Sequence, residues 1–192
     1  MNNMQGRGYL VEATAQFLKD KIGEQAWNEV RRQASPELQR QLDRGFEPAG
    51  WYPVSMFNEL IEQLVVRVGQ NDEEKVKTTL FQCGQFAATS ASNSFLKILL
   101  KIMTPTLFVR KAPTMFRRDF TMGRMDVEMN DNSLSARLYE MAELPHVAAY
   151  SPGFLAFPLN AMGKNVTDVK LTEWGLDKPY VEGGGFTIEW AA

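Results

Sequence analysis

The sequence predicts an α+β fold, in which a helical N-terminal part packs on a C-terminal four-stranded antiparallel sheet with one crossover helix. Two observations carry this prediction. Apolar residues recur at helical spacing up to about residue 122, and beyond it they alternate with polar residues. With 192 residues, the chain is long enough for one domain with a real core. We therefore expect a single domain, residues 1–192, with a mainly helical part over 1–122 and a β-rich part over 123–192.

The first helices are delimited by glycines and by one capping serine. Apolar residues share a face in 8–22 and again in 24–34, and Gly23 separates the two stretches. Ser35-Pro36 is a helix start signal, because serine caps free backbone N–H groups and proline suits the first helical position. Gly45 is placed to end that helix.

Three further helices are predicted before the next proline-rich stretch. Ser55 is expected to cap a helix that Gly69 ends. Asn71 or Asp72 caps the following one, whose first turn is acidic and so favours the positive end of the helix dipole. The apolar run at 95–103 is the third helix.

The hydrophobic period changes from 3.6 to 2 in the C-terminal third of the chain. A turn cluster, Asn130-Asp131-Asn132, separates two alternating stretches. Alternate residues of a strand point to opposite faces, so this pattern predicts an antiparallel hairpin with one buried face. The apolar residues expected on that face are Met125, Val127, Met129, Leu134, Ala136 and Leu138.

One helix and two more strands are expected to complete the β-rich part. Ser151-Pro152 is a start signal for the crossover helix, which Pro158 kinks or shortens and Gly163 ends. Segments 166–172 and 186–190 alternate in the manner of strands.

Charge and composition narrow the range of partners and locations. The net charge is −2 and the pI about 5.6, so no global basic field favours nucleic acid. No apolar run reaches the roughly 20 residues that span a bilayer, and the first ten residues lack the basic and apolar regions of a signal peptide. We expect a cytoplasmic protein. Cys83, the single cysteine, excludes a disulfide within the chain and is expected as a buried structural thiol.

The sequence offers no convergent set of catalytic groups. His146 is the only histidine, so any Ser-His-Asp or Cys-His arrangement would depend on it. No Gly-x-Ser-x-Gly elbow supplies a nucleophile, and Gly183-Gly184-Gly185 precedes a strand rather than opening a phosphate-binding helix. We therefore predict that the chain is not an enzyme, and that His146 is a surface or partly buried loop residue.

Residues 92–118 combine an apolar wall with a cationic rim. This combination would suit an amphipathic organic ligand or an anionic partner, whereas the alternative interpretation is a solvated rim that pairs with nearby acids such as Asp119. The rim residues are Arg110, Lys111, Phe116, Arg117 and Arg118.

Several of these segments resemble one family, the haem–nitric oxide binding (H-NOX) domains. GRGYLVEATAQFLKDKIGEQAWNEV (6–30) resembles the opening of those domains, FLKILLKIM (95–103) their Phe-Leu-x-x-Leu-x-x-Leu-His helix, and KAPTMFR (111–117) their Ala-Pro-Ser-Phe-Arg segment. The matching residues of the first segment are Gly23, Glu24, Trp27 and Val30. The chain is also similar to other members of this broad superfamily, which includes four-vinyl-reductase-type small-molecule-binding domains and bacterial paralogues.

The departures from the family pattern concern the cofactor. Met103 stands where haem-binding members carry the proximal histidine, and no histidine lies in 1–145. No cofactor is therefore expected, and Met103 would be a metal ligand only if haem were bound. The family's propionate-binding Tyr-x-Ser-x-Arg triplet corresponds here to Ser133, Ser135 and Arg137, which share one strand face. They would bind a carboxylate or phosphate, or else form the solvated face of the hairpin.

The resemblance implies a sensory or regulatory domain with a small-molecule pocket between the helical part and the sheet. A hydrophobic or amphipathic ligand would shift the two parts, and a signalling protein would detect the shift. Arg137, with Ser133 and Ser135, would be the polar anchor of the pocket. Its expected walls are Phe95, Leu99, Met103, Leu107, and Leu134 or Leu138.

Two alternatives stay open at the level of sequence. The first is a ligand-free protein-interaction module, in which side chains fill the core and the amphipathic surface near 51–57 docks a partner. The second is a haem-based gas sensor whose iron has a non-histidine ligand.

Overall fold

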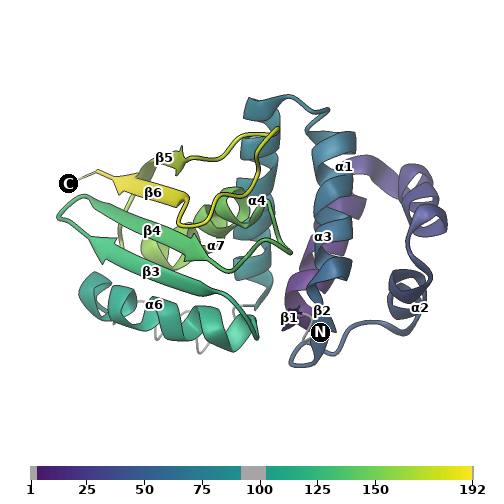
Figure 1. Ribbon diagram of the computed structural model, residues 1–192, viewed down its shortest axis with the longest axis horizontal. Coiled ribbons are helices and arrows are strands. Elements are labelled where there is room, and N and C mark those ends of the chain that lie inside the picture. Colours follow the sequence, from purple (N-terminus) through teal and green to yellow (C-terminus); the bar gives the residue numbers. More distant parts are fainter. Residues whose placement is uncertain (1–3, 92–102, 192) are drawn as a thin grey trace.

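The computed structural model describes residues 4–91 and 103–191, in which helices surround one main sheet (Figure 1). The helix predicted over 95–103 lies outside the described residues, except for Met103. In chain order the elements are β1 (Gln5–Arg7), α1 (Gly8–Gln33), α2 (Pro36–Arg44), β2 (Trp51–Pro53), α3 (Val54–Gln63), the π-helix η1 (Leu64–Val68), α4 (Glu73–Ala91), α6 (Pro105–Asp119), β3 (Arg124–Met129), β4 (Ser133–Tyr139), α7 (Val147–Ala161), β5 (Val166–Thr172) and β6 (Gly185–Trp190).

The main sheet has four antiparallel strands in the order β3-β4-β6-β5, which confirms the predicted α+β class. Leu138 pairs with Met125 of β3, and Leu134 pairs with Ile188 of β6. Because directly paired residues share a face, the alternating apolar residues form a single core-facing surface. Leu134 and Leu138 are both fully buried there, as the period of 2 predicted.

Two helices, α6 and α7, pack against this sheet. α6 lies along β3 at the edge of the sheet, and α7 lies behind the sheet in this view (Figure 1). The buried stripe of α6 consists of Phe108, Ala112 and Phe116, at the spacing of one helix face. Thr104 caps this helix, since its side chain accepts a hydrogen bond from the Leu107 backbone N–H.

α4 and α7 approach each other closely because two glycines face the contact. A Cβ on Gly84 would lie 2.2 Å from the carbonyl oxygen of Tyr150, and one on Gly153 would lie 1.9 Å from that of Phe81. Any larger residue would push the helices apart. This contact fixes the position of α7, which carries aromatic side chains toward the cavity described below.

The N-terminal helices α1, α2 and α4 have caps and breaks at residues that the sequence predicted for these roles. Gly23 interrupts α1 with a φ of 79° and a ψ of 168°, a conformation that is essentially confined to glycine. Ser35 caps α2 by accepting from the Leu38 backbone N–H, and Gly45 ends it with a φ of 83°. At the start of α4, Asp72 rather than Asn71 is the cap, because its carboxylate accepts from the Lys75 backbone N–H at 2.9 Å.

A small two-stranded sheet, β1 with β2, was not predicted from the sequence. Gly6 pairs with Tyr52 in antiparallel register. Each strand has three residues, which is too short for an alternating pattern to be recognised. The pairing brings the N-terminus against the end of the loop before α3.

The predicted start of α3 at a Ser55 cap is wrong. The helix begins at Val54, with Pro53 in the cap position and no side-chain cap. Here the small sheet sets the boundary, since the Val54 backbone N–H donates to the Met4 carbonyl oxygen at 3.0 Å. The backbone contact with Met4, and not a cap at Ser55, therefore decides where α3 begins.

The predicted start of the crossover helix at Ser151-Pro152 is also wrong. α7 begins at Val147, and the two residues lie inside it. The His146 carbonyl oxygen accepts from the Ala149 and Tyr150 backbone N–H groups, so the first turn is already formed upstream. Nearly every side of this helix is buried, and the packing energy outweighs the loss of one N–H donor at the proline.

The buried apolar residues form one cluster that runs from the helical part into the sheet. It includes Leu18 and Leu60 from the N-terminal helices and Phe186 and Ile188 from β6. Among residues 4–91 and 103–191, no helix is long and apolar enough to cross a membrane.

Candidate ligand cavity

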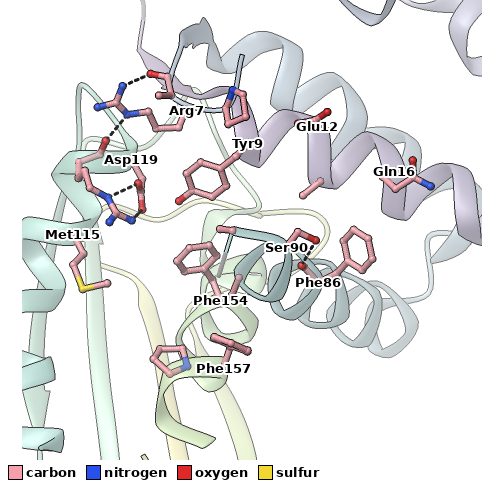
Figure 2. A pocket seen from close by; sticks show the side chains of 17 residues that line it. Arg7, Tyr9, Glu12, Gln16, Phe86, Ser90, Met115, Asp119, Phe154 and Phe157 are labelled. Atoms are coloured by element: carbon pink, nitrogen blue, oxygen red, sulfur yellow. Dashed lines mark hydrogen bonds and ion pairs between the residues drawn. The ribbon is translucent and has the colours of Figure 1, made fainter. Parts of the chain in front are cut away.

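An open cavity of about 670 Å³ lies between α1, α4, α6 and α7 (Figure 2). Its wall is mostly apolar; Arg7, Tyr9 and Asp119 lie at one end of it, and further polar residues of α1 and α4 lie along it (Figure 2). The described residues that line it are Arg7, Tyr9, Glu12, Ala13, Gln16, Pro48, Ala49, Phe86, Ala88, Ser90, Ala91, Met115, Arg118, Asp119, Phe154, Phe157 and Pro158. A volume of this size is in the range of ligand pockets.

A narrower crevice of about 50 Å³ adjoins this cavity and reaches toward the sheet. Met115, Asp119 and Phe154 line both spaces. The crevice has Phe108 on one side and Tyr150 on another, so its wall is almost entirely apolar. Of the residues that line both spaces, Asp119 is the polar one.

Tyr9 projects from the first turn of α1 toward Asp119 and lies over the Phe154 ring (Figure 2). The two ring centroids are 6.5 Å apart. The Tyr9 hydroxyl oxygen is buried, and its polar neighbours are the Asp119 carboxylate and the Arg118 guanidinium. Burial, and then the charge of Asp119, raise the pKa of Tyr9, so its side chain is a neutral phenol at physiological pH.

Asp119 is a buried carboxylate, 5% exposed, at the C-terminal end of α6. Arg118 neutralises it through two contacts, Nε to Oδ1 at 3.1 Å and Nη2 to Oδ2 at 3.3 Å. Each carboxylate oxygen therefore accepts one charge-assisted hydrogen bond and retains a free lone pair. The pair presents acceptor oxygens without a net charge.

Arg7 holds the rim of the cavity together. Its Nε donates to the Arg118 carbonyl oxygen at 2.9 Å, its Nη1 donates to the Ala49 carbonyl oxygen, and its guanidinium lies 3.8 Å from the centroid of the Trp51 ring. These contacts tie β1, the loop before β2 and α6 to one another.

Tyr150 supplies a second buried hydroxyl, in the inner crevice. The Tyr150 residue is 3% exposed. Burial raises the pKa of Tyr150 above its usual range, the charges of Cys83, Tyr9 and Asp119 raise it further, and a hydrogen bond with Thr14 opposes the rise. Two phenols and one carboxylate are thus close enough to act on each other electrostatically.

The helical residues predicted for the pocket wall lie elsewhere or are not described. Phe95 and Leu99 lie outside the described residues. Met103 is half-buried against the core, and Leu107 is 43% exposed on the outer side of α6. Neither Met103 nor Leu107 is among the described residues that line the cavity.

The predicted residues of β4 are divided between the two faces of the strand. Leu134 faces the core and is fully buried, whereas Ser133, Ser135 and Arg137 lie on the opposite, polar face. There Ser135 Oγ lies 2.9 Å from Thr187 Oγ1, and Arg137 is exposed. The structure does not bring these four residues together around one space, and their role in ligand binding stays a prediction.

Tyr9, Tyr150 and the buried Asp119 were not singled out as site residues from the sequence. Tyr9 and Tyr150 stand in apolar stretches that carry no local signal of a binding site, and Asp119 follows a basic run that favours a solvated ion pair. One sequence signal for this site was usable: Arg118 and Asp119 are adjacent opposite charges that follow an apolar helix face.

His146 and Cys83 both lie away from the cavity wall. The His146 imidazole packs on the Trp174 ring at 6.1 Å between centroids, and its Nε2 is 3.5 Å from Glu62 Oε1. With 4% exposure it is more deeply buried than a loop histidine was expected to be, because it forms the cap position of α7. Cys83 is fully buried as predicted, with its Sγ 3.7 Å from Thr14 Oγ1.

Comparison with known proteins defines the fold class. No protein-family model and no curated protein matches the chain. The Fe(II) unliganded H-NOX protein from K. algicida matches at 14% identity and a TM-score of 0.70, over 97% of each chain. The Fe(II)NO H-NOX protein from S. oneidensis matches at 12% identity and a TM-score of 0.66, over 97% of this chain and 99% of that one.

The chain therefore has an H-NOX-like fold, as the sequence resemblance predicted. At this level of identity the likeness extends to the fold alone. What the cavity holds must be judged from the side chains of this chain.

Haem, the group that this fold implies, does not fit the donors around the cavity. His146 does not line it, and the raised pKa of Tyr9 opposes the phenolate form in which tyrosine ligates iron. The Met115 thioether lines both spaces, but a thioether usually ligates haem iron opposite a histidine. Among the described residues, no group of three or more His, Cys, Asp or Glu side chains is placed to hold a metal ion.

Proposed function

We propose that the chain is a sensory or regulatory domain that binds a small amphipathic organic molecule in the cavity between α1, α4, α6 and α7. The observation that carries this proposal is an open, mostly apolar cavity of about 670 Å³ whose lining includes the Tyr9 side chain and the Arg118–Asp119 pair. An amphipathic molecule would bury its apolar part against this wall and place its polar part beside these side chains.

The fold of solved H-NOX proteins supports the sensory part of the proposal, since proteins of this fold are described in Fe(II), Fe(II)NO and Fe(II)CO states. In this chain residues of α1, α4, α6 and α7 all line the cavity. A ligand that contacts all four helices would favour one arrangement of the N-terminal helices against the sheet. A signalling protein would bind that arrangement. No catalytic step is part of this proposal.

The cavity volume favours this function over a ligand-free interaction module. Such a module would have a core filled by side chains, whereas an open cavity of about 670 Å³ is present here, and Phe154 and Phe157 line it. The donor set around the cavity likewise gives no support to a haem-based gas sensor.

Anilinonaphthalene sulfonate, an amphipathic fluorescent probe, tests the proposal with two matched variants. Ser90 lines the cavity, and its neighbour Thr89 on α4 does not. Both are exposed, and each hydroxyl donates to the carbonyl oxygen four residues earlier. We expect saturable 1:1 binding to the native protein. Ser90→Trp should weaken it by about tenfold or more, corresponding to about 1.4 kcal/mol, and Thr89→Trp should leave it unchanged.

The proposal is contradicted if the native protein shows no saturable binding, or if both tryptophan variants bind the probe equally well. Native mass spectrometry of the purified protein provides a second readout. A co-purifying organic molecule that Ser90→Trp excludes and Thr89→Trp retains would support the cavity as its site.

A further inference from the structure

The helix α6 has two sides of different character. Its inner side is apolar and packs along β3 at the edge of the sheet (Figure 1), whereas its outer side carries basic residues. Arg110, Lys111 and Arg117 are exposed there. Leu107, which is 43% exposed, stands on the same side. These four residues are called here the basic face of α6.

Helical periodicity places the basic face on one arc of the helix surface. At about 100° per residue, its four residues fall within about 120° around the axis, and Leu107 lies between Arg110 and Lys111. With a rise of about 1.5 Å per residue, the face is about 15 Å long from Leu107 to Arg117. It therefore presents three cations around one exposed apolar side chain.

The three cations of the basic face form no ion pair in the described part of the chain. The pairing with nearby acids that was considered from the sequence does occur at Arg118, which binds Asp119. No acidic residue stands three or four positions from Arg110, Lys111 or Arg117, the spacing at which a helix can neutralise its own cations. Their charges are therefore available to an external anion.

The local charge of α6 contrasts with the rest of the protein. The helix α2 also carries exposed arginines, but Glu37 and Asp43 are exposed among them. The whole chain has a net charge of −2, so the basic face is a positive patch on an acidic protein. Arg117 in the last turn complements the helix dipole, whereas Arg110 and Lys111 lie in the middle of α6, where the dipole does not call for cations.

We propose that the basic face of α6 docks an acidic segment of a partner protein, whose carboxylates meet the three cations and whose apolar side chain contacts Leu107. Charge complementarity carries this choice of partner. A membrane surface fits less well, because a helix that binds lipid buries its apolar side there, and the apolar side of α6 is already packed on the sheet. The inference goes beyond the proposed function, since the docking needs no ligand in the cavity.

Two labelled peptides of about 14 residues, each about 21 Å long as a helix, test the proposal by fluorescence anisotropy on the full chain. One consists of glutamate, alanine and a central leucine, and the other has glutamine in place of every glutamate. We expect the acidic peptide to bind about tenfold more tightly, because only its charges are attracted by the basic face. Raising the NaCl concentration from about 20 mM to about 200 mM should remove most of this difference.

Two triple variants with the same change of charge locate the binding. The first replaces the cations of the basic face: Arg110→Gln, Lys111→Gln and Arg117→Gln. The control replaces three exposed arginines of α1 and α2: Arg32→Gln, Arg40→Gln and Arg44→Gln. The first should weaken binding of the acidic peptide by about tenfold or more, which is about 1.4 kcal/mol from three exposed contacts. The control should change it by less than about twofold, because distant charges are screened.

A fourth substitution tests the apolar contact without changing the charge. Leu107→Ser should weaken binding of the acidic peptide by about threefold, and an unchanged affinity would overturn the contact with Leu107.

The remaining outcomes decide the site and the class of partner. Equal losses in the two triple variants would overturn the basic face as the site, since they would reflect net charge alone. The proposal also fails if the native protein does not bind the acidic peptide, or if it binds a DNA duplex or phosphatidylserine vesicles more tightly than the peptide. None of these results bears on the cavity, which the experiment with anilinonaphthalene sulfonate decides separately.

Discussion

The buried imidazole of His146 makes stability depend on pH in a direction that the structure specifies. The side chain is 4% exposed, and its Nδ1 is buried without a hydrogen-bond partner in the described residues. Burial lowers the pKa of His146 from 6.5 to about 4. In the unfolded chain the imidazole regains an ordinary pKa of about 6.5.

The sign of the effect follows from which state binds the proton more tightly. Between about pH 6.5 and pH 4 the unfolded chain is protonated at His146 and the native protein is not, so acid favours unfolding. A difference of about 2.5 pKa units corresponds to about 3.4 kcal/mol, lost progressively as the pH falls through this window and constant below it. Glu62, 3.5 Å away, has a pKa raised by burial and opposes part of this loss.

Urea denaturation at several pH values between 7.5 and 4.5, on the native protein and on His146→Gln, measures this contribution. Groups common to both proteins cancel in the difference between their unfolding free energies. We expect the native protein to lose about 2–3 kcal/mol more than the variant over this range. A difference in pH dependence below about 1 kcal/mol would falsify the argument, because it would mean that the imidazole is solvated in the folded state.

Three further predictions test the packing. Gly153→Ala places a Cβ 1.9 Å from a carbonyl oxygen of α4 and should lower the unfolding free energy, measured by urea denaturation, by about 2 kcal/mol or more. The control Gly175→Ala meets only the side-chain oxygens of Asp177 and Glu73 and should lower it by under about 1 kcal/mol. Leu134→Ala, on the core face of β4, should lower the unfolding free energy by about 2–5 kcal/mol, and Ser135→Ala, on the polar face, by about 1 kcal/mol. Equal losses in the two variants would contradict the assigned strand register. Cys83 is fully buried with its pKa raised to about 12, so its thiol should react with a disulfide reagent at pH 8 only after unfolding, and rapid reaction in the native state would refute its burial.

Much of the fold was predictable because its signals are local. The alternation around Leu134 follows from the geometry of a strand with one buried face, and Ser35 and Gly45 act within a few residues of themselves. The errors arose where distant contacts override a local signal. Val54 begins α3 because its N–H reaches Met4, and the buried surroundings of α7 accommodate Pro152 inside the helix.

The candidate cavity was predictable in kind but not in its residues. A pocket between helices and sheet was expected from the family resemblance, and the apolar wall does include α6 with Met115. The proposed polar anchor on Arg137 was placed by analogy with a motif, whereas the structure exposes that side chain and buries Asp119. Burial of one acidic residue after a basic run depends on what α1 brings against it, and no local pattern reports this.

The sequence by itself determined the periods, and hence the order of helices and strands, together with a strict limit on chemistry: a single histidine, His146, and none in the segments that resemble a haem domain. These are properties of composition and of neighbours along the chain. Only the tertiary structure decided that Tyr9 and Asp119 line one cavity while His146 lies outside its lining. The physical reason is that desolvation and unsatisfied hydrogen bonds depend on residues brought together from distant helices, so they exist only in the folded chain.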